Sequence, residues 1–406
     1  MLRKKCLVCD ADNLNEIINL GPHPFADTFV PESKVSEADA IYPLVCDLCQ
    51  NCGHVQTRCE TSPIERYSQI DYSYTSSNSA FSRSHWENFA KEISEKLNLK
   101  SDALVVEAGS NDGYLCEQFL KRGNRVVGVD PSPYMAELAK QRNVATIVGL
   151  FGMSYSEQIL KKHGKADLVI ANNVFNHADN PLDFAKSVDS ILSPQGSFVF
   201  EQPYWLETVQ SGKFDQIYHE HVSYFTVRSA AELLARAGMA IISAKIVNYH
   251  GGSLRIIAQK KENVLQESDD VKKMIDCEIK SGAFDLEFYK EFMHKILTQR
   301  NLFLQKICKL KQEGHSIVAV GAAAKANTFL NFYKLDNSFI DYVTDASPHK
   351  KGKYTPATRI PIVGDEIFSK YGSVYALILS WNIAPQLKEK LFPINSNIQF
   401  ISPEEA

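Results

Sequence analysis

The stretch that decides the fold is Ala103-Leu-Val-Val-Glu107-Ala-Gly109-Ser-Asn111-Asp112-Gly113. An apolar run of strand length precedes a loop with two glycines, and the spacing of 113–123 predicts a helix. A second predicted strand, 125–130, ends in Asp130, twenty-one residues beyond Gly109. An acidic residue at this place accepts hydrogen bonds from ribose hydroxyls, so the unit is predicted to bind a ligand that contains a nucleoside.

The alternation of strands and helices continues on the C-terminal side of this unit. Predicted strands cover 145–149, 166–171 and 196–200, and predicted helices cover 133–142, 154–163 and 181–192. Two further strands, 240–247 and 253–260, are expected at the other end of the same sheet. This spacing predicts an α/β fold with a parallel, doubly wound sheet.

The chemistry of the glycine loop narrows the ligand. The loop reads E-x-G-x-N-x-G and not G-x-G-x-x-G. Carboxylates at Glu107 and Asp112 repel a pyrophosphate but suit the ammonium group of a methionine. This pattern is typical of S-adenosylmethionine (SAM) methyltransferases. NAD is a less favoured ligand, and a turn with a purely structural role is the other alternative. The predicted cofactor-binding residues are Glu107, Gly109, Asn111, Gly113, Asp130 and Asn172.

The cysteines are concentrated near the N-terminus, where six of nine fall within the first 59 residues. The pairs Cys6/Cys9 and Cys49/Cys52 each have C-x2-C spacing, and two such turns complete a tetrahedral zinc site. Cys46 also forms C-x2-C with Cys49, which leaves the register open, and free buried thiols are the alternative. Four thiolates without a neighbouring base predict a structural zinc.

Composition excludes several classes of function. Lys and Arg number 44 and Asp and Glu 48, so the net charge of −4 gives no basic surface for nucleic acid or membrane. No apolar stretch approaches 18 residues, and no signal-peptide core follows the basic start. A cytoplasmic protein of two or three domains is therefore expected.

A histidine-rich motif carries the expected chemistry. Tyr218-His219-Glu220-His221 supplies a base, a carboxylate to orient it and a phenolic donor for an oxyanion. Position 223 is Ser223, so the H-E-x-x-H metalloprotease pattern is excluded. An H-x-H metal site and polar residues on a helix surface remain as alternatives. His177 is expected at the carboxyl edge of the sheet, either as a catalytic or as a structural histidine.

The rest of the chain predicts three further parts. A Tyr/Ser-rich segment around Tyr72 and Tyr74 is either a solvated linker or the lining of a polar ligand pocket, and an amphipathic helix is expected at 84–98. Residues 262–312 are charged and helical, as in a bridge between domains. A second α/β run follows, with strands at 316–321, 339–345, 374–381 and 398–402 and a helix at 324–335. The two α/β parts are candidates for a duplication.

Taken together, the chain resembles the SAM-dependent sugar-nucleotide C-methyltransferases, which methylate carbon 3 of a 4-keto-deoxysugar nucleotide. The resemblance spans both C-x2-C pairs, the segment 72–77, the glycine loop, Tyr218–His221 and Gly321-Ala-Ala-Ala-Lys325-Ala-Asn327-Thr328. It continues through 341–345, 351–354 and 380–382. One departure is Ala357, where a glycine is expected after Pro356.

The resemblance implies roles for individual residues. The base that removes the carbon-3 proton falls on His221, with Glu220, Tyr218 and His177 beside it. One of Tyr72 and Tyr74 holds the sugar or phosphate. The C-terminal domain helps to hold the nucleotide, and Lys325, Asn327 and Lys351 either meet its phosphates or are solvated surface residues.

The predicted organisation is a zinc-binding module at 1–75, a Rossmann-like SAM methyltransferase domain at 76–262, and a bridge with a Rossmann-like α/β domain at 263–406. The expected cofactors are SAM and a structural zinc ion. The expected partner is a nucleotide-linked 4-keto-deoxysugar, with no nucleic acid and no membrane. Two other functions stay open: a sugar O-methyltransferase, and a scaffold that binds SAM and zinc without catalysis.

Overall fold

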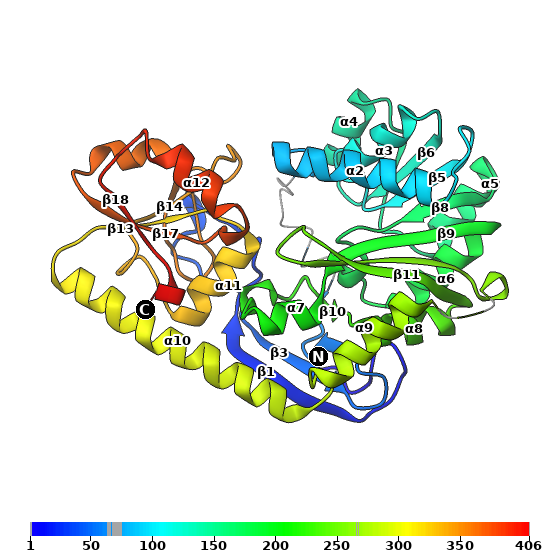
Figure 1. Cartoon of the computed structure of the whole chain (residues 1–406). Coiled ribbons are helices and arrows are strands. Elements are labelled where there is room, and N and C mark those ends of the chain that lie inside the picture. Colours follow the sequence, from blue (N-terminus) through cyan, green and yellow to red (C-terminus); the bar gives the residue numbers. More distant parts are fainter. Residues whose placement is uncertain (1, 63–65, 67–74, 265, 267, 406) are drawn as a thin grey trace.

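The computed structural model describes residues 2–62, 66, 75–264, 266 and 268–405. The predicted substrate-binding residues Tyr72 and Tyr74 lie outside the described residues. Figure 1 places two α/β bodies side by side, with the N-terminal strands below them. In the part of the chain that is described, no helix is long and apolar enough to cross a membrane.

The central sheet has the strand order β11-β12-β9-β8-β5-β6-β7. Its strands are β5 (Leu104–Ala108), β6 (Arg125–Asp130), β7 (Thr146–Val148), β8 (Ala166–Ile170), β9 (Leu192–Pro203), β11 (Met239–Val247) and β12 (Ser253–Lys260). The strands from β7 to β9 are parallel, as predicted. The remaining side of the sheet differs from the predicted parallel arrangement. There β12 pairs antiparallel with β9, and β11 pairs antiparallel with β12.

Helices cover the central sheet, and all but the last two lie close to where the sequence predicts a helix. They are α2 (Ala80–Lys96), α3 (Tyr114–Leu120), α4 (Pro133–Gln141), α5 (Met153–His163), α6 (Pro181–Ile191), α7 (Trp205–Gln210) and α8 (Val227–Arg236). Helix α2 begins before the predicted residue 84. Its start is set by Ser79, whose side chain accepts a hydrogen bond from the backbone N–H of Ser82.

The N-terminal module is an antiparallel sheet that recruits a strand from much later in the chain. Its order is β1 (Leu14–His23), β3 (Tyr42–Cys49), β4 (Val55–Thr57) and β10 (Ser223–Tyr224). Strand β10 directly follows the Tyr218–His221 motif and pairs with β4. The zinc-binding module therefore supports the segment that carries the expected chemistry.

The C-terminal body is a second parallel sheet, with β16 (Ile362–Val363), β14 (Tyr342–Thr344), β13 (Ile317–Val320), β17 (Val374–Ile378) and β18 (Ile398–Ile401) in that order. Its helices are α11 (Ala324–Tyr333) and α12 (Ala384–Leu391), and the bridge consists of α9 (Asp269–Lys280) and α10 (Leu286–Gln312). The short strands β2 (Val30–Pro31) and β15 (Lys353–Tyr354) pair, which joins this body to the N-terminal module. Helix α10 runs along its lower side in Figure 1.

Short 3-10 helices connect these elements. They are η1 (Glu32–Lys34), η2 (Phe175–His177), η3 (Phe214–Gln216), η4 (Lys261–Asn263), η5 (Asp365–Lys370), η6 (Trp381–Ile383) and η7 (Pro403–Glu405). Two of them matter for the site, since η2 ends in His177 and η3 precedes the Tyr218–His221 motif.

The two α/β bodies repeat one hydrogen-bond arrangement at the end of their second strand. In the central body, the N–H of Asn111 donates to Oδ2 of Asp130 over 2.9 Å. In the C-terminal body, the N–H of Ala322 donates to Oδ2 of Asp345, also over 2.9 Å. A shared loop geometry of this kind fits a duplicated Rossmann-like unit.

The departure at Ala357 has a local consequence. Its φ angle is 59°, in the left-handed region that favours glycine over alanine. The backbone N–H of Ala357 and the guanidinium of Arg359 both bond the carboxylate of Asp39, in the N-terminal module. Long-range contacts therefore hold a conformation that alanine adopts poorly by itself.

Candidate active site and zinc centre

Four cysteines meet in the N-terminal module. Within the described part of the chain, the Sγ atoms of Cys6, Cys9, Cys49 and Cys52 all lie within 4.8 Å of one another and are buried. The Cys6–Cys52 and Cys9–Cys49 sulfur distances are 3.6 and 3.5 Å. Cys46 is not in this group, so the register question is settled for Cys49 and Cys52. Four convergent thiols are the donor set of a closed, structural zinc site.

At the carboxyl edge of β5, the backbone requires glycine. Gly109 has φ of 69°, and a Cβ atom there would lie 2.1 Å from Cγ2 of Val174. The preceding Glu107 is 6% exposed. The pKa of its carboxyl is raised to about 8, mainly by burial and also by the neighbouring charges of Asp112 and Asp130. A cationic ligand would favour the ionised form of this carboxyl.

Asp130 and Asn172 border the same edge. Asp130 accepts the N–H groups of Asn111 and Ser132 through its two carboxylate oxygens, each over 2.9 Å. Asn172 accepts the N–H of Glu201 over 2.8 Å, while its Nδ2 is buried without a hydrogen-bond partner among the described residues. That amide is placed to donate to a ligand at the strand ends.

The side chain of Asn111 contacts the segment on the N-terminal side of the central domain. Its Oδ1 accepts the backbone N–H of Ser76 over 2.8 Å. The hydroxyls of Ser76 and Ser77 also donate to the carboxylate of Asp112. The glycine loop is therefore tied to the segment that follows the predicted substrate tyrosines.

The histidine motif lies in a buried turn between η3 and β10, and not on a helix surface. Nδ1 of His221 lies 2.8 Å from the carbonyl oxygen of Gln216. A carbonyl only accepts, so Nδ1 carries the proton and Nε2 keeps a lone pair. The rings of His177 and Tyr218 lie 4.9 and 3.9 Å from that of His221, between centroids.

Both histidines are neutral at pH 7. Burial lowers the pKa of His221 well below its usual value, and the nearby His177 lowers it further. Burial also lowers the pKa of His177 to about 3. A neutral imidazole that is already oriented is a suitable general base.

Glu220 meets a residue that sequence reasoning missed. Its Oε1 accepts the backbone N–H of Asp27 over 3.4 Å, and its buried Oε2 has no partner among the described residues. The pKa of Glu220 is raised to about 7, mainly by burial and also by the charge of Asp27. Asp27 lies in the N-terminal module, where no motif marked it. The carbonyl of Gln216, and not Glu220, bonds Nδ1 of His221.

The C-terminal body brings a lysine to the same region. Nζ of Lys325 lies 4.6 Å from the ring centroid of Trp381 and has no hydrogen-bond partner among the residues described. Burial lowers the pKa of Lys325 to about 8, an effect opposed by the charge of Asp215. Trp381 in turn donates from Nε1 to Asp215 over 2.6 Å.

Asn327 and Lys351, the other two residues predicted to bind substrate from the C-terminal body, have surroundings different from those of Lys325. Asn327 is 1% exposed and donates its side-chain amide to the carbonyl of Ala26, which joins α11 to the loop that carries Asp27. Lys351 is exposed. The neighbouring Lys350 donates to the carbonyl of Ala322 over 2.7 Å, and its Nζ lies 5.1 Å from the ring centroid of Phe29 in the N-terminal module.

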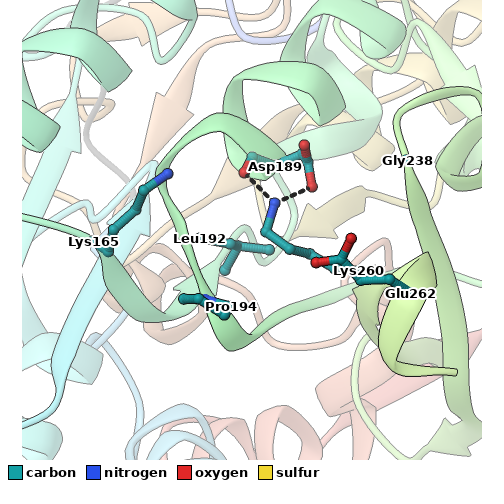
Figure 2. Close-up of a pocket in the computed structure, with 7 residues that line it drawn as sticks. All are labelled: Lys165, Asp189, Leu192, Pro194, Gly238, Lys260 and Glu262. Atoms are coloured by element: carbon teal, nitrogen blue, oxygen red, sulfur yellow. Dashed lines mark hydrogen bonds and ion pairs between the residues drawn. The ribbon is translucent and has the colours of Figure 1, made fainter.

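A cavity of about 230 Å³ lies at the amino ends of β8 and β9, away from the carboxyl ends that border the candidate site (Figure 2). Lys165 and Leu192 line it from the beginnings of β8 and β9. Lys260 crosses it to bond Oδ1 of Asp189 over 2.7 Å. Ligands of parallel α/β sheets bind at the carboxyl edge, so this cavity is separate from the candidate site.

Comparison with known families accounts for nearly the whole chain. Residues 6–67 match a domain described as zinc-binding, 82–244 a methyltransferase domain, and 248–403 a C-methyltransferase C-terminal domain. The C-methyltransferase NovU of Streptomyces niveus is 29% identical over 401 residues, which cover 98% of this chain and 95% of NovU. These matches support a SAM-dependent C-methyltransferase.

Solved methyltransferase structures resemble the C-methyltransferase more distantly. Magnesium protoporphyrin IX methyltransferase of Synechocystis, with bound SAH, is 16% identical with a TM-score of 0.36, covering 44% of this chain and 83% of its own. The 1,6-didemethyltoxoflavin-N1-methyltransferase of Burkholderia thailandensis is 20% identical with a TM-score of 0.37, covering 52% of this chain and 96% of its own. The strand order of the central sheet itself defines the fold of this domain.

The C-methyltransferase uses SAM and carries zinc in its N-terminal domain. The cysteine cluster fits the metal, because thiolates are preferred zinc ligands. The carboxyl edge of β5 and β6 fits the cofactor, because it combines a close backbone approach at Gly109 with carboxyl groups for an ammonium and a ribose.

Proposed function

We propose that this C-methyltransferase methylates carbon 3 of a 4-keto-deoxysugar nucleotide after His221 removes the proton from that carbon. One observation carries the proposal: Nδ1 of His221 is held by the carbonyl of Gln216, which leaves the Nε2 lone pair for a proton. The enclosed position of the motif, between the zinc-binding module and both α/β bodies, supports it.

The chemistry requires a base and a donor for the ketone oxygen. A C–H bond beside a ketone breaks heterolytically when a base takes the proton and the oxygen accepts the electron pair. His221 gains an N–H bond at Nε2 and becomes an imidazolium, which balances the charge of the enolate. The hydroxyl of Tyr218 or the carboxyl of Glu220, whose pKa is raised to about 7, donates to the enolate oxygen.

Carbon 3 then forms its new bond. SAM supplies an electrophilic methyl group on its sulfonium sulfur. The chain's own contribution is to hold the two reactants in line at the carboxyl edge, since positioning supplies much of the acceleration in such a transfer. Glu107, Gly109 and Asp130 hold the cofactor, with Gly113 opening the following helix and Asn172 at the neighbouring strand.

The nucleotide end of the substrate is proposed to meet the C-terminal body. Lys325, whose buried Nζ has no hydrogen-bond partner among the described residues, is proposed to bind a phosphate. Asn327 acts by holding the loop at Ala26. Lys351 and one of Tyr72 and Tyr74 complete the set of proposed substrate contacts. The reduced thiols of the zinc site suit a cytoplasmic location.

The test is to incubate the enzyme with SAM and 4-keto-deoxysugar nucleotides in heavy water. We expect deuterium at carbon 3 when transfer is blocked with SAH, and a new C–CH3 group by NMR when SAM is present. A methyl ether in the product would replace this proposal by O-methylation. SAM binding without any transfer, across a panel of keto-sugar nucleotides, would favour a scaffold.

A further inference from the structure

Gln202 is a buried polar residue without a role so far. It lies near the carboxyl end of β9 and is 1% exposed. Neither Oε1 nor Nε2 of its side chain has a hydrogen-bond partner among the described residues. Burying an amide without partners is costly, and buried amides in native proteins find protein, water or ligand atoms.

The direction of the side chain follows from strand geometry. Alternate residues of a strand face the same side of the sheet, so Gln202 shares its face with Phe200. The Phe200 ring lies 5.1 Å from that of Phe175, which begins the short helix ending in His177. The intervening Glu201 faces the other side, where it bonds His85 over 2.7 Å.

A second aromatic contact of Phe200, with Phe225, also places this face of β9 near the histidine motif. The Phe200 ring lies 6.5 Å from that of Phe225, which follows Tyr224 and thus the histidine motif. The backbone N–H of Trp205 bonds the carbonyl of Phe225, which fixes the end of β9 against β10. Gln202 therefore lies at the carboxyl edge, on the side of the sheet that carries His177 and His221.

We propose that the Gln202 amide binds the substrate's ketone oxygen and a hydroxyl on the neighbouring carbon, and so determines specificity for an α-hydroxyketone. An amide offers one donor and one acceptor side by side, and an α-hydroxyketone offers the complementary acceptor and donor. This inference rests on the proposed function, because it names the group recognised at that site. It adds a contact that acts on the substrate and leaves the cofactor untouched.

The test is Gln202→Leu, which removes both polar atoms at similar size. We expect kcat/KM for a 3-hydroxy-4-keto-sugar nucleotide to fall roughly 10- to 100-fold, as for other lost hydrogen bonds to a buried partner. The preference over the analogue that lacks the 3-hydroxyl should shrink by a similar factor. SAM affinity and the melting temperature should stay at the wild-type values. Gln202→Met serves as a second variant if the leucine variant folds poorly.

The matched control is Gln259→Leu, in the adjacent strand, where the amide bonds Ser197 over 3.0 Å far from the carboxyl edge. Its kcat/KM should stay at the wild-type value. The inference is overturned if Gln202→Leu keeps both kcat/KM and the hydroxyl preference, or if it loses SAM affinity instead, which would place the amide on the cofactor. Absence of C-methyl product from the wild-type enzyme is a separate result and overturns the proposed function.

Discussion

Nδ1 of His221 lies 2.8 Å from the carbonyl oxygen of Gln216, the last residue of η3, five residues earlier in the chain. This bond fixes both the orientation of the ring and the position of its proton, so that Nε2 is the basic nitrogen. A backbone carbonyl cannot change its protonation state. The imidazole is thus kept neutral by burial and oriented by the Gln216 carbonyl.

His221→Ala should reduce kcat by about 10²- to 10⁴-fold, the usual contribution of a positioned general base. SAM binding, measured by calorimetry, should stay unchanged because the cofactor residues lie on other strands. His294→Ala, on the exposed side of α10, is the control and should keep full activity. Turnover at the wild-type rate in His221→Ala would refute the role of this base.

Asp27→Asn should shift one limb of the pH–rate profile to lower pH. The charge of Asp27 disfavours ionisation of Glu220 and so contributes to its raised pKa of about 7, which Arg66 opposes. Removing that charge lowers the pKa of Glu220, whichever protonation state the reaction needs. Asp12→Asn, an exposed change in the same module, should leave the profile in place. A shift to higher pH would contradict the pairing.

Cys9→Ser should lower zinc affinity by on the order of 100-fold or more, because it removes one of four thiolate ligands. Loss of the metal should also loosen β10, which pairs with β4 beside the cysteine turn. We expect faster hydrogen exchange at 218–224 and lower kcat, with metal content measured by elemental analysis. Cys277→Ser, exposed and outside the cluster, should change neither. Retained activity in zinc-free Cys9→Ser would separate the metal from the site.

Glu107→Gln should change how stability depends on pH. The pKa of Glu107 is raised to about 8 in the folded protein from a usual 4.5, so its folded form favours the protonated carboxyl. The protonated Glu107 carboxyl therefore contributes to the free energy of unfolding. This contribution is complete below pH 4.5 and is lost as the pH rises through 8. The free energy of unfolding of the wild type should therefore fall relative to the glutamine variant across this window, by a few kcal/mol at most (on the order of 1.4 per unit of pKa).

Chemical denaturation at several pH values measures this difference, without cofactor. Glu137→Gln, which alters an exposed carboxyl on α4, should run parallel to the wild type. A pH-independent difference between wild type and Glu107→Gln would mean that the carboxyl is not buried in its neutral form.

Local motifs were readable because their chemistry depends on short spacings. The C-x2-C turns, the glycine loop ending at Gly113 and the alternation of strands with helices each depend on residues that are close in the sequence. The backbone at position 109 is left-handed and requires a glycine, and that glycine can be read directly from the sequence. These features alone predicted the fold class, the cofactor and the metal.

The tertiary structure decided which groups meet across the chain. The sequence left Cys46 as an alternative ligand, did not mark Lys350, and offered no indication that Asp27 contacts Glu220. The recruitment of β10 into the N-terminal sheet was likewise invisible. Spacing along the chain determines local conformation, whereas contacts between residues hundreds of positions apart depend on how three packed bodies close around one site, and only the folded chain fixes that.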